Sequence, residues 1–456
     1  MANQALPNYL TAAKANPAEN RAPWFKNTAP AYAGIFLSVP FMAGMAGGLV
    51  YGNITASLIG LIMGAFFCLV IYYVPAKLGM KTGMPLYVVA SSSFGAQGGI
   101  VVPGFLMGIV QVFWHAFFTT SAAAFFMEAI GKSPADSQAL YWVVCAVWGL
   151  SMAFVGAVGI SLLGKMSSWI PVFPLVFIIL AAVANKSGIT QFGTNVVALE
   201  NVTGVAISLA MFATLQSAVG FFASAGVAGT DFGMNSRNEN DVALGGFVGV
   251  TMAAIVAGVL AILTIAGAAG KDPEIAAKVT SGDTLNAFVD SIAATGGLAK
   301  VSAWVFVIAC ICPTGFCAFL ASNAFATMLP KLPRVPMTMV AGLIGVILAA
   351  TGLASNLVGF FVMVGAAFGP IAGVMLADYI RSGGWNGPRK GINWAGYIAW
   401  AFGLVLGLLG VLTKNKFGYG LESLVPMVSA AAAYFALAGM GLESESISME
   451  QESTQA

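Results

Sequence analysis

The chain has 456 residues, of which 59% are hydrophobic and 8% are charged, with a formal net charge of +2. Soluble domains have about 25% charged residues, so the composition excludes a water-soluble fold and predicts one polytopic membrane domain. Near-neutral charge without a basic cluster argues against nucleic-acid binding. The single histidine, His115, argues against metalloenzymes and catalytic triads, so we expect neither a cofactor nor an enzyme.

The chain begins with a polar segment and continues with apolar stretches. Residues 1–28 lack the apolar core of a secretory signal, and we expect them to be a cytoplasmic segment. A membrane helix needs about 20 apolar residues. We expect twelve such helices, numbered as spans 1 to 12, in a transmembrane domain over 29–440: 29–50, 54–75, 99–127, 140–159, 162–184, 203–228, 243–269, 300–329, 336–352, 355–379, 393–413 and 421–440.

The ends of the chain and its loop charges predict an orientation. An even number of spans places both termini on one side of the membrane. If that side is the cytoplasm, its segments hold twelve Lys and Arg residues against seven on the other side, in agreement with the positive-inside rule. We therefore expect a multi-pass plasma (bacterial inner) membrane protein with both termini in the cytoplasm. The last residues, 441–456, are acidic and lack Lys and Arg, and we expect a disordered cytoplasmic tail.

A faint internal repeat links spans 1 and 6. Span 1 contains AGMAG (43–47) and span 6 contains AGVAG (225–229). Because five spans separate them, a five-span repeat would be inverted in the membrane, as is common in secondary transporters. Chance is the alternative, since Gly and Ala are frequent in this chain.

Three spans contain residues that interrupt a helix. Pro40 in span 1 and Pro313 in span 8 have no N–H, which frees the carbonyls of Phe36 and Ala309. Span 6 contains the glycine-rich stretch GFFASAGVAG (220–229). Irregular backbone at membrane depth is tolerated where it lines a cavity, and free carbonyls there can bind a cation. A packing kink is the alternative for each proline alone.

Span 3 carries a polar stripe. Its members follow helical spacing, and Trp114 lies beside them: Gly104, Gly108, Gln111, His115 and Thr119. The Gln111 amide suits the edge of a heterocycle, and the Trp114 indole offers a face for stacking. The alternative is a set of polar contacts between helices, which we favour for His115.

Charged residues in or near the spans suggest further roles. Lys165 lies about one turn into span 5, where an ammonium is costly and could load and release a proton; snorkelling to the interface is the alternative. Asp231 and Asp378 end spans 6 and 10, where we expect them to pair with Arg237 and Arg381. The cysteines of CICPTGFC lack a second ligand pair, so we expect no metal site there.

Five stretches, in this order, resemble a known family: AKLGMKTGMPLYVVASSSFG (76–95), GIVQVFW (108–114), FASAGVAGTDFGMNSRN (222–238), CPTGFCAFLAS (312–322) and GPIAGVMLADY (369–379), the last followed by GINWAGY. The chain resembles the nucleobase–cation symporter family, the purine–cytosine permeases, and is most like the bacterial cytosine permease type. The resemblance implies an all-α leucine-transporter fold with alternating access. Its first repeat would be about 29–184 and its second about 203–379, followed by two extra helices over 393–440.

The resemblance also implies a substrate site between spans 1, 3, 6 and 8. A glutamine that bonds the base falls on Gln111, and a tryptophan that stacks on it falls on Trp114. A Ser–Phe segment of span 6 falls on Ser224 and Phe222. An asparagine of span 8 falls on Cys310, a poor hydrogen-bond partner, and this departure speaks against cytosine as the substrate.

The coupling-ion site departs from the family as well. Sodium-coupled members use span 1 carbonyls, which fall on Phe36 or Pro40, and two hydroxyls of span 8. Those hydroxyls fall on Pro313 and Thr314, so one oxygen is missing. Because Lys165 could supply a proton site, our hypothesis is proton coupling, with sodium coupling as the alternative.

These features predict a secondary active importer of a small planar heterocycle: a nucleobase, a hydantoin-like ring or a vitamin precursor. The expected partners are this small molecule and the lipid bilayer. A passive channel is the alternative from another class, but it would need a continuous polar pore lining, which the scattered polar residues do not provide.

Overall fold

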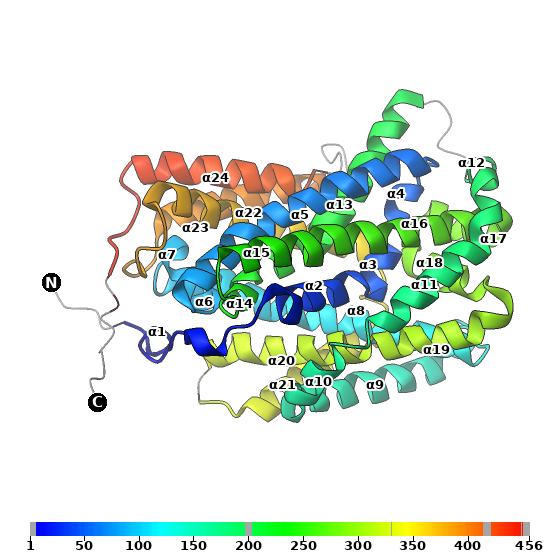
Figure 1. Ribbon diagram of the computed structural model, residues 1–456, viewed down its shortest axis with the longest axis horizontal. Helices are drawn as coiled ribbons and strands as arrows, with labels where there is room; N and C mark the ends of the chain where they lie inside the picture. The colour runs from blue at the N-terminus through cyan, green and yellow to red at the C-terminus, as the bar shows by residue number, and fades with distance from the viewer. Residues whose placement is uncertain (1–5, 197–202, 330, 414–420, 448, 450–456) are drawn as a thin grey trace.

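The computed structural model describes residues 6–196, 203–329, 331–413, 421–447 and 449. Figure 1 shows long helices that run roughly along the longest axis of the molecule. Within the described ranges, β-structure is limited to two isolated bridges. The all-α prediction is therefore confirmed.

The helices match the twelve predicted spans. Among the described residues, nine helices are long and apolar enough to cross a membrane, and a bent pair makes a tenth. Two shorter apolar helices correspond to spans 9 and 12. In chain order the spans are α2 (Thr28–Phe36) with α3 (Val39–Gly44) and α4 (Ala46–Leu49); α5 (Ile54–Thr82); α8 (Leu106–Ala129); α9 (Gln138–Val158); α10 (Ile160–Met166) with α11 (Val172–Asn185); α13 (Thr203–Val227) with α14 (Gly229–Gly233); α15 (Glu239–Gly246) with α16 (Ala253–Lys271); α19 (Ala299–Ala309) with α20 (Ile311–Met328); α21 (Arg334–Ala350); α22 (Leu357–Ser382); α23 (Trp394–Leu412); and α24 (Leu424–Gly439).

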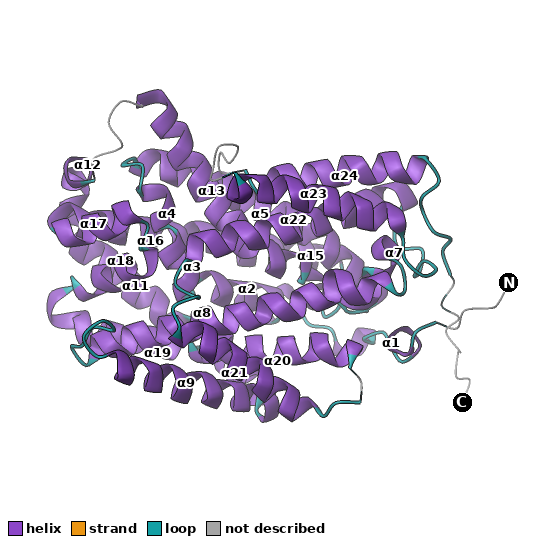
Figure 2. Cartoon of the chain, turned by 180° about the vertical axis from the view of Figure 1, so that it is seen from behind, coloured by secondary structure: helices purple, strands orange, loops and turns teal. Residues whose placement is uncertain are grey.

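Short helices fill the connections. The two connections 76–98 and 270–299 between predicted spans contain α6 (Leu86–Val89) with α7 (Ser91–Phe94), and α17 (Pro273–Ser281) with α18 (Thr284–Ala293). Helical turns over 100–105 and 247–252 extend spans 3 and 7, α12 (Phe192–Asn195) follows span 5, and α1 (Asn8–Thr11) precedes the bundle. Figures 1 and 2 agree that α22, α23 and α24 lie along one edge of the bundle and α9, α19 and α21 along the other.

Both ends of the described chain lie on one side of the bundle. Near the N-terminus, the Tyr9 hydroxyl donates to the carbonyl of Ala96 at 2.5 Å. Near the C-terminus, Ser446 pairs with Arg389, whose carbonyl accepts from the N–H of Ala96 at 2.7 Å. We call this the terminal side of the bundle and the opposite side the far side.

The predicted interruptions are present in spans 1 and 8. In span 1, α2 and the helix that follows it are bent by 51° around Leu37 and Ser38, and Pro40 lies in the first turn of α3. In span 8, Cys310 separates α19 from α20. Pro40 and Pro313 each lie just beyond the break, because proline is tolerated in the first turn of a helix.

Span 6 differs from the prediction. The glycine-rich stretch 220–229 is helical through Val227, and only Ala228 interrupts it. Its glycines serve close packing instead: a Cβ on Gly220 would lie 2.3 Å from the carbonyl oxygen of Phe361, and one on Gly226 would lie 2.6 Å from Ile71. Glycine here therefore permits helix contact rather than unwinding.

Span 5 contains a break that the sequence did not predict. The expected helix over 162–184 is divided into α10 and α11 by turns over 167–171. Pro171 is the residue before α11 and Pro174 lies in its first turn, where a missing N–H costs least. Lys165 therefore lies on the short helix before the break rather than inside a continuous span.

The start of the tail is ordered, whereas the sequence predicted disorder over 441–456. Glu443 lies 2.6 Å from the Arg389 guanidinium and 3.2 Å from that of Arg381. Basic partners at the end of span 10 and in the next loop offset the entropy lost on ordering the segment 441–447. The tail residues 448 and 450–456 lie outside the described residues.

The aspartates expected to close spans 6 and 10 have other partners than predicted. Asp378 pairs with Arg389 at 2.9 Å rather than with Arg381. Asp231 accepts a hydrogen bond at 3.0 Å from the main-chain N–H at the start of α6. Arg237 instead pairs with Asp241, one helical turn further along the chain, at 2.7 Å. Local helical spacing therefore decides the Arg237 pair.

Spans 2 and 6 approach each other through glycine. A Cβ on Gly60 would lie 2.0 Å from the carbonyl oxygen of Met211, and one on Gly64 would lie 2.9 Å from the Cβ of Ala218. Small residues allow this contact, because helices within a membrane associate by close packing rather than by a hydrophobic driving force.

Replacing Gly60 with alanine should lower the melting temperature, because overpacking at a backbone contact costs about 1–3 kcal/mol. The matched control is Gly439→Ala at the end of α24, where a Cβ would meet nothing within 4 Å. Thermal unfolding of both variants in detergent gives the comparison. Equal shifts for the two variants would show that the contact between spans 2 and 6 is loose.

Candidate functional site

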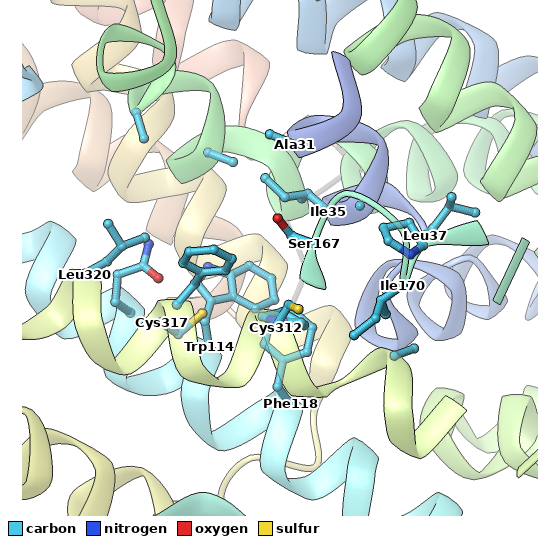
Figure 3. Close-up of a pocket in the computed structure, with 18 of the residues that line it drawn as sticks. Ala31, Ile35, Leu37, Trp114, Phe118, Ser167, Ile170, Cys312, Cys317 and Leu320 are labelled. Atoms are coloured by element: carbon cyan, nitrogen blue, oxygen red, sulfur yellow. The ribbon is translucent and has the colours of Figure 1, made fainter. Parts of the chain in front are cut away.

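A cavity of about 370 Å³ lies between spans 1, 3, 5, 6 and 8 (Figure 3). Its wall is mostly apolar, and among the described residues that line it none is charged. The cavity therefore suits an uncharged molecule with a few polar atoms. The lining residues with polar atoms or thiols in their side chains are Gln111, Trp114, Ser167, Ser224, Cys312 and Cys317.

All four interruptions in spans 1, 5, 6 and 8 border this cavity. Leu37 lines it at the bend of span 1, and Ala228 lines it at the end of α13. Pro171 lines it from the break in span 5, and Ala309 lies next to the break in span 8. Irregular backbone that borders one cavity is the arrangement by which membrane transporters present main-chain groups to a ligand.

Trp114 and Gln111 lie one helical turn apart on α8 and reach the cavity together. The indole N–H of Trp114 donates to Ser224 Oγ at 3.3 Å, which connects span 3 to span 6 across the site. The Gln111 amide has a weak contact, Nε2 to Met107 Sδ at 3.5 Å. An amide with only a sulfur partner retains most of its hydrogen-bonding capacity for a ligand. The structure thus brings together Gln111, Trp114 and Ser224, three residues that the sequence assigned to substrate binding.

Aromatic rings close the far side of Trp114. Its ring lies 5.1 Å from Phe221 of span 6, and 4.9 and 5.8 Å from Phe360 and Phe361 of span 10. Phe221 in turn packs against Phe41 of span 1 at 5.0 Å. Apart from Pro174, which lies near the middle of span 5, the lining residues of spans 1, 5 and 6 belong to the terminal halves of those spans. The cavity therefore extends from Trp114 toward the terminal side.

Two predicted substrate residues do not line the cavity. Phe222 is fully buried and stacks on Phe36 with ring centroids 5.2 Å apart. The cavity face of span 6 is formed by Phe221 and the residues three, four and seven positions later, so Phe222 points about 100° away. Cys310 is also buried outside the lining, and Cys312 and Cys317 line the cavity in its place, beside Trp114 in Figure 3.

The residues predicted for the coupling ion are distributed around the breaks. Phe36 and Pro40 flank the bend of span 1 but do not line the cavity, whereas Pro313 does. The Thr314 hydroxyl donates to the carbonyl of Cys310, one turn earlier, and accepts from the indole N–H of Trp148 at 3.4 Å. This hydroxyl is therefore already bonded.

Lys165 is exposed on α10 and is not a lining residue. Ser167, two residues later, does line the cavity and donates to the carbonyl of Gly164 at 2.9 Å. The lysine thus stands beside the terminal-side part of the cavity rather than within it.

His115 has the structural role that the sequence favoured. Its Nδ1 lies 2.9 Å from the carbonyl oxygen of Thr314 on the neighbouring span 8. A Cβ on Gly345 of span 9 would lie 2.5 Å from the imidazole, so the ring fills a gap between three helices. His115 therefore connects helices behind the cavity.

Sequence reasoning missed several lining or nearby residues. Phe221, Ser167 and Cys317 line the cavity, and the pair Pro171 and Pro174 was the signal for the break that brings span 5 to it. Ser38, at the bend of span 1, is buried, and its hydroxyl has no hydrogen-bond partner among the described residues. Nor do the described residues gather three His, Cys, Asp or Glu side chains into a possible metal site.

Residues 16–435 match the sequence pattern of a family described as permeases for cytosine/purines, uracil, thiamine and allantoin. The chain belongs to this permease family. It is 28% identical over 360 residues to the cytosine permease of Escherichia coli K12, a match that covers 74% of this chain and 75% of that protein. The resemblance seen in the sequence is thereby confirmed, and members of the family are transporters rather than enzymes.

Solved structures confirm the fold. The inward-facing conformation of Mhp1 is 15% identical, with a TM-score of 0.70 over 97% of each chain. A second structure is a closed conformation of Mhp1, a nucleobase-cation-symport-1 family transporter, with bromovinylhydantoin bound. It is 15% identical, with a TM-score of 0.67 over 98% of each chain. The permease therefore has the leucine-transporter fold, as predicted.

The cavity predicts which cysteines react with a membrane-permeant maleimide. Cys312 and Cys317 line it, whereas Cys68, Cys145 and Cys310 are buried elsewhere. We expect the first two to be labelled faster in the native protein, as measured by mass spectrometry of the peptides over time. The control is the denatured protein, in which all five should react alike. Similar rates for all five in the native protein would contradict the assigned lining.

Proposed function

We propose that this permease imports an uncharged planar heterocycle of the nucleobase, hydantoin or vitamin-precursor class. One observation carries the proposal: four interrupted spans border one cavity that holds the Gln111 amide and the Trp114 ring. A flat aromatic face and a side-chain amide complement a heterocycle with a donor–acceptor edge. The relatives support the class, since one is a cytosine permease and another binds bromovinylhydantoin.

The proposed cycle uses the two ends of the cavity in turn. The terminal side corresponds to the cytoplasm, in agreement with the charge bias of the loops. The present conformation would then release substrate inward, because the aromatic rings around Trp114 close the far side. In the outward-facing state these rings would separate while the terminal halves of spans 1, 5 and 6 close. A closed far side also argues against a passive channel.

For the coupling ion we propose a proton. The Thr314 hydroxyl is already bonded, Pro313 supplies none, and no carboxylate is among the described lining residues, so oxygen ligands for sodium are few. Lys165 would carry the proton from its position beside the terminal-side part of the cavity. The Ser38 hydroxyl is the observation that favours sodium, because it is buried at the bend of span 1 without a described partner.

Replacing Gln111 with alanine should weaken ligand binding by about 1–3 kcal/mol, because polar atoms of the substrate lose their partner. The ligand is first identified by a thermal-shift screen of purines, pyrimidines, hydantoins and vitamin precursors. A compound that binds the native protein raises the melting temperature of the protein. Affinity is then measured by calorimetry in detergent.

The matched control is Gln216→Ala. Gln216 is a buried amide outside the lining, bonded to Ser423 of span 12 at 2.8 Å. The Gln216→Ala variant should be less stable than the original protein but should bind the ligand with unchanged affinity. If the Gln111 variant binds as tightly as the original protein, Gln111 is not part of the site.

In proteoliposomes, a pH gradient without sodium should drive uptake, and Lys165→Ala should abolish that dependence. Lys186→Ala is the control, because Lys186 is also exposed but lies at the opposite end of span 5. Uptake driven by sodium alone and lost in Ser38→Ala would instead establish the sodium alternative and reject proton coupling.

A further inference from the structure

The last described residues form a strap across the terminal side. This C-terminal strap, residues 441–447, runs beside the loop 383–393 that joins spans 10 and 11. Ser446 pairs with Arg389 in an antiparallel bridge, and the N–H of Ile447 donates to the carbonyl of Pro388 at 2.7 Å. The Ser444 hydroxyl donates to the carbonyl of Ile392 at 2.9 Å. At the other end of the strap, the N–H of Ala395 donates to the carbonyl of Leu442 at 3.3 Å, so main-chain bonds hold both ends.

The strap supplies one carboxylate of a charge cluster at the terminal end of span 10. The Arg389 side chain is only 8% exposed and lies 2.9 Å from Asp378 and 2.6 Å from Glu443. The Tyr434 hydroxyl is within hydrogen-bond distance of both carboxylates. Glu443 also lies 3.2 Å from Arg381, so two positive and two negative groups alternate. Loss of Glu443 would leave Arg381 without its acidic partner and Arg389 with Asp378 alone, so the ion pairs between the strap and the end of span 10 would be lost.

The same cluster reaches the segment that leads into span 3. Ser92 and Ser93, on α7, donate to Asp378 Oδ2 at 2.6 and 3.0 Å. Arg389 Nε donates to the carbonyl of Ser92 at 2.8 Å, and the Arg389 main chain bonds Ala96. The terminal end of span 10 is thus joined to the segment that precedes the helix carrying Gln111 and Trp114.

At its other end, span 10 makes aromatic contacts in place of ion pairs. Phe360 and Phe361, in its first turn, cover Trp114 on the far side. Pro370 lies between these rings and the clamped end, and its missing N–H leaves the helix without the bond to Ala366. A proline inside a long helix is a usual place for bending.

We propose that the C-terminal strap is a clamp that fixes the terminal end of span 10 against the segment before span 3, so that only the far half of span 10 moves in the transport cycle. Glu443 is then a positioning residue for gating and does not contact the substrate. The proposal rests on the proposed transport function, because it describes how that cycle moves span 10. The alternative is that the strap only stabilises the fold.

The test compares two neighbouring glutamates of the full chain. Glu443→Gln removes a partly buried charge, and Glu445→Gln removes an exposed one, since Glu445 and its partner Lys390 are 79% and 61% exposed. Hydrogen exchange in detergent should become roughly tenfold faster over 86–98 and 376–393 in the first variant and stay unchanged in the second. Removal of residues 443–456 should reproduce the first result.

Transport separates a clamp from general stability. In proteoliposomes Glu443→Gln should lower the maximal uptake rate several-fold while ligand affinity stays the same, and Glu443→Asp should recover part of the rate. Unchanged exchange over 86–98 and 376–393 would overturn the proposal. So would faster exchange over the whole protein with a matching loss of affinity. Because exchange needs no substrate, failure of the clamp and failure of the proposed function are distinguishable.

Discussion

The cost of an unpaired backbone group in hydrocarbon governs this structure. A membrane helix can break only where protein or a water-accessible cavity satisfies the freed N–H and C=O groups. In this permease four breaks, at Leu37–Ser38, 167–171, Ala228 and Cys310, converge on one cavity. Apolar side chains form most of the wall, so under the proposed function the polar atoms at the breaks, with Gln111 and Ser224, would give the cavity its specificity.

Contacts away from the cavity form a frame that connects the broken spans 6 and 8 to their neighbours. Glycine contacts bring spans 2 and 6 together at Gly60, and His115 holds spans 3 and 8 together behind the cavity. On the terminal side, the cluster around Arg389 joins span 10 to the segment before span 3. Dispersion contacts and buried polar bonds thus hold the frame. On the far side, Trp114 and the rings of span 10 meet only through aromatic packing, which is less directional than a hydrogen bond.

Much of this could be predicted from the sequence, because membrane spans and prolines leave local signals. The twelve spans, the breaks near Pro40 and Pro313, and the shared position of Gln111, Trp114 and Ser224 all follow from periodicity and the family resemblance. Failures arose where tertiary contacts decide. Whether glycines in span 6 unwind or pack depends on Phe361, and whether Phe222 or Phe221 faces the cavity depends on a 100° rotation. The ordered strap depends on the distant Arg389, which no local pattern in the acidic tail indicates.

A solved structure of this permease with a heterocycle from the screen bound would decide the matter most directly. The account predicts a flat ligand against the Trp114 ring, with a polar edge within hydrogen-bond distance of the Gln111 amide and the breaks of spans 1 and 8 around it. A ligand bound outside this cavity, with Gln111 and Trp114 unchanged in their surroundings, would contradict it.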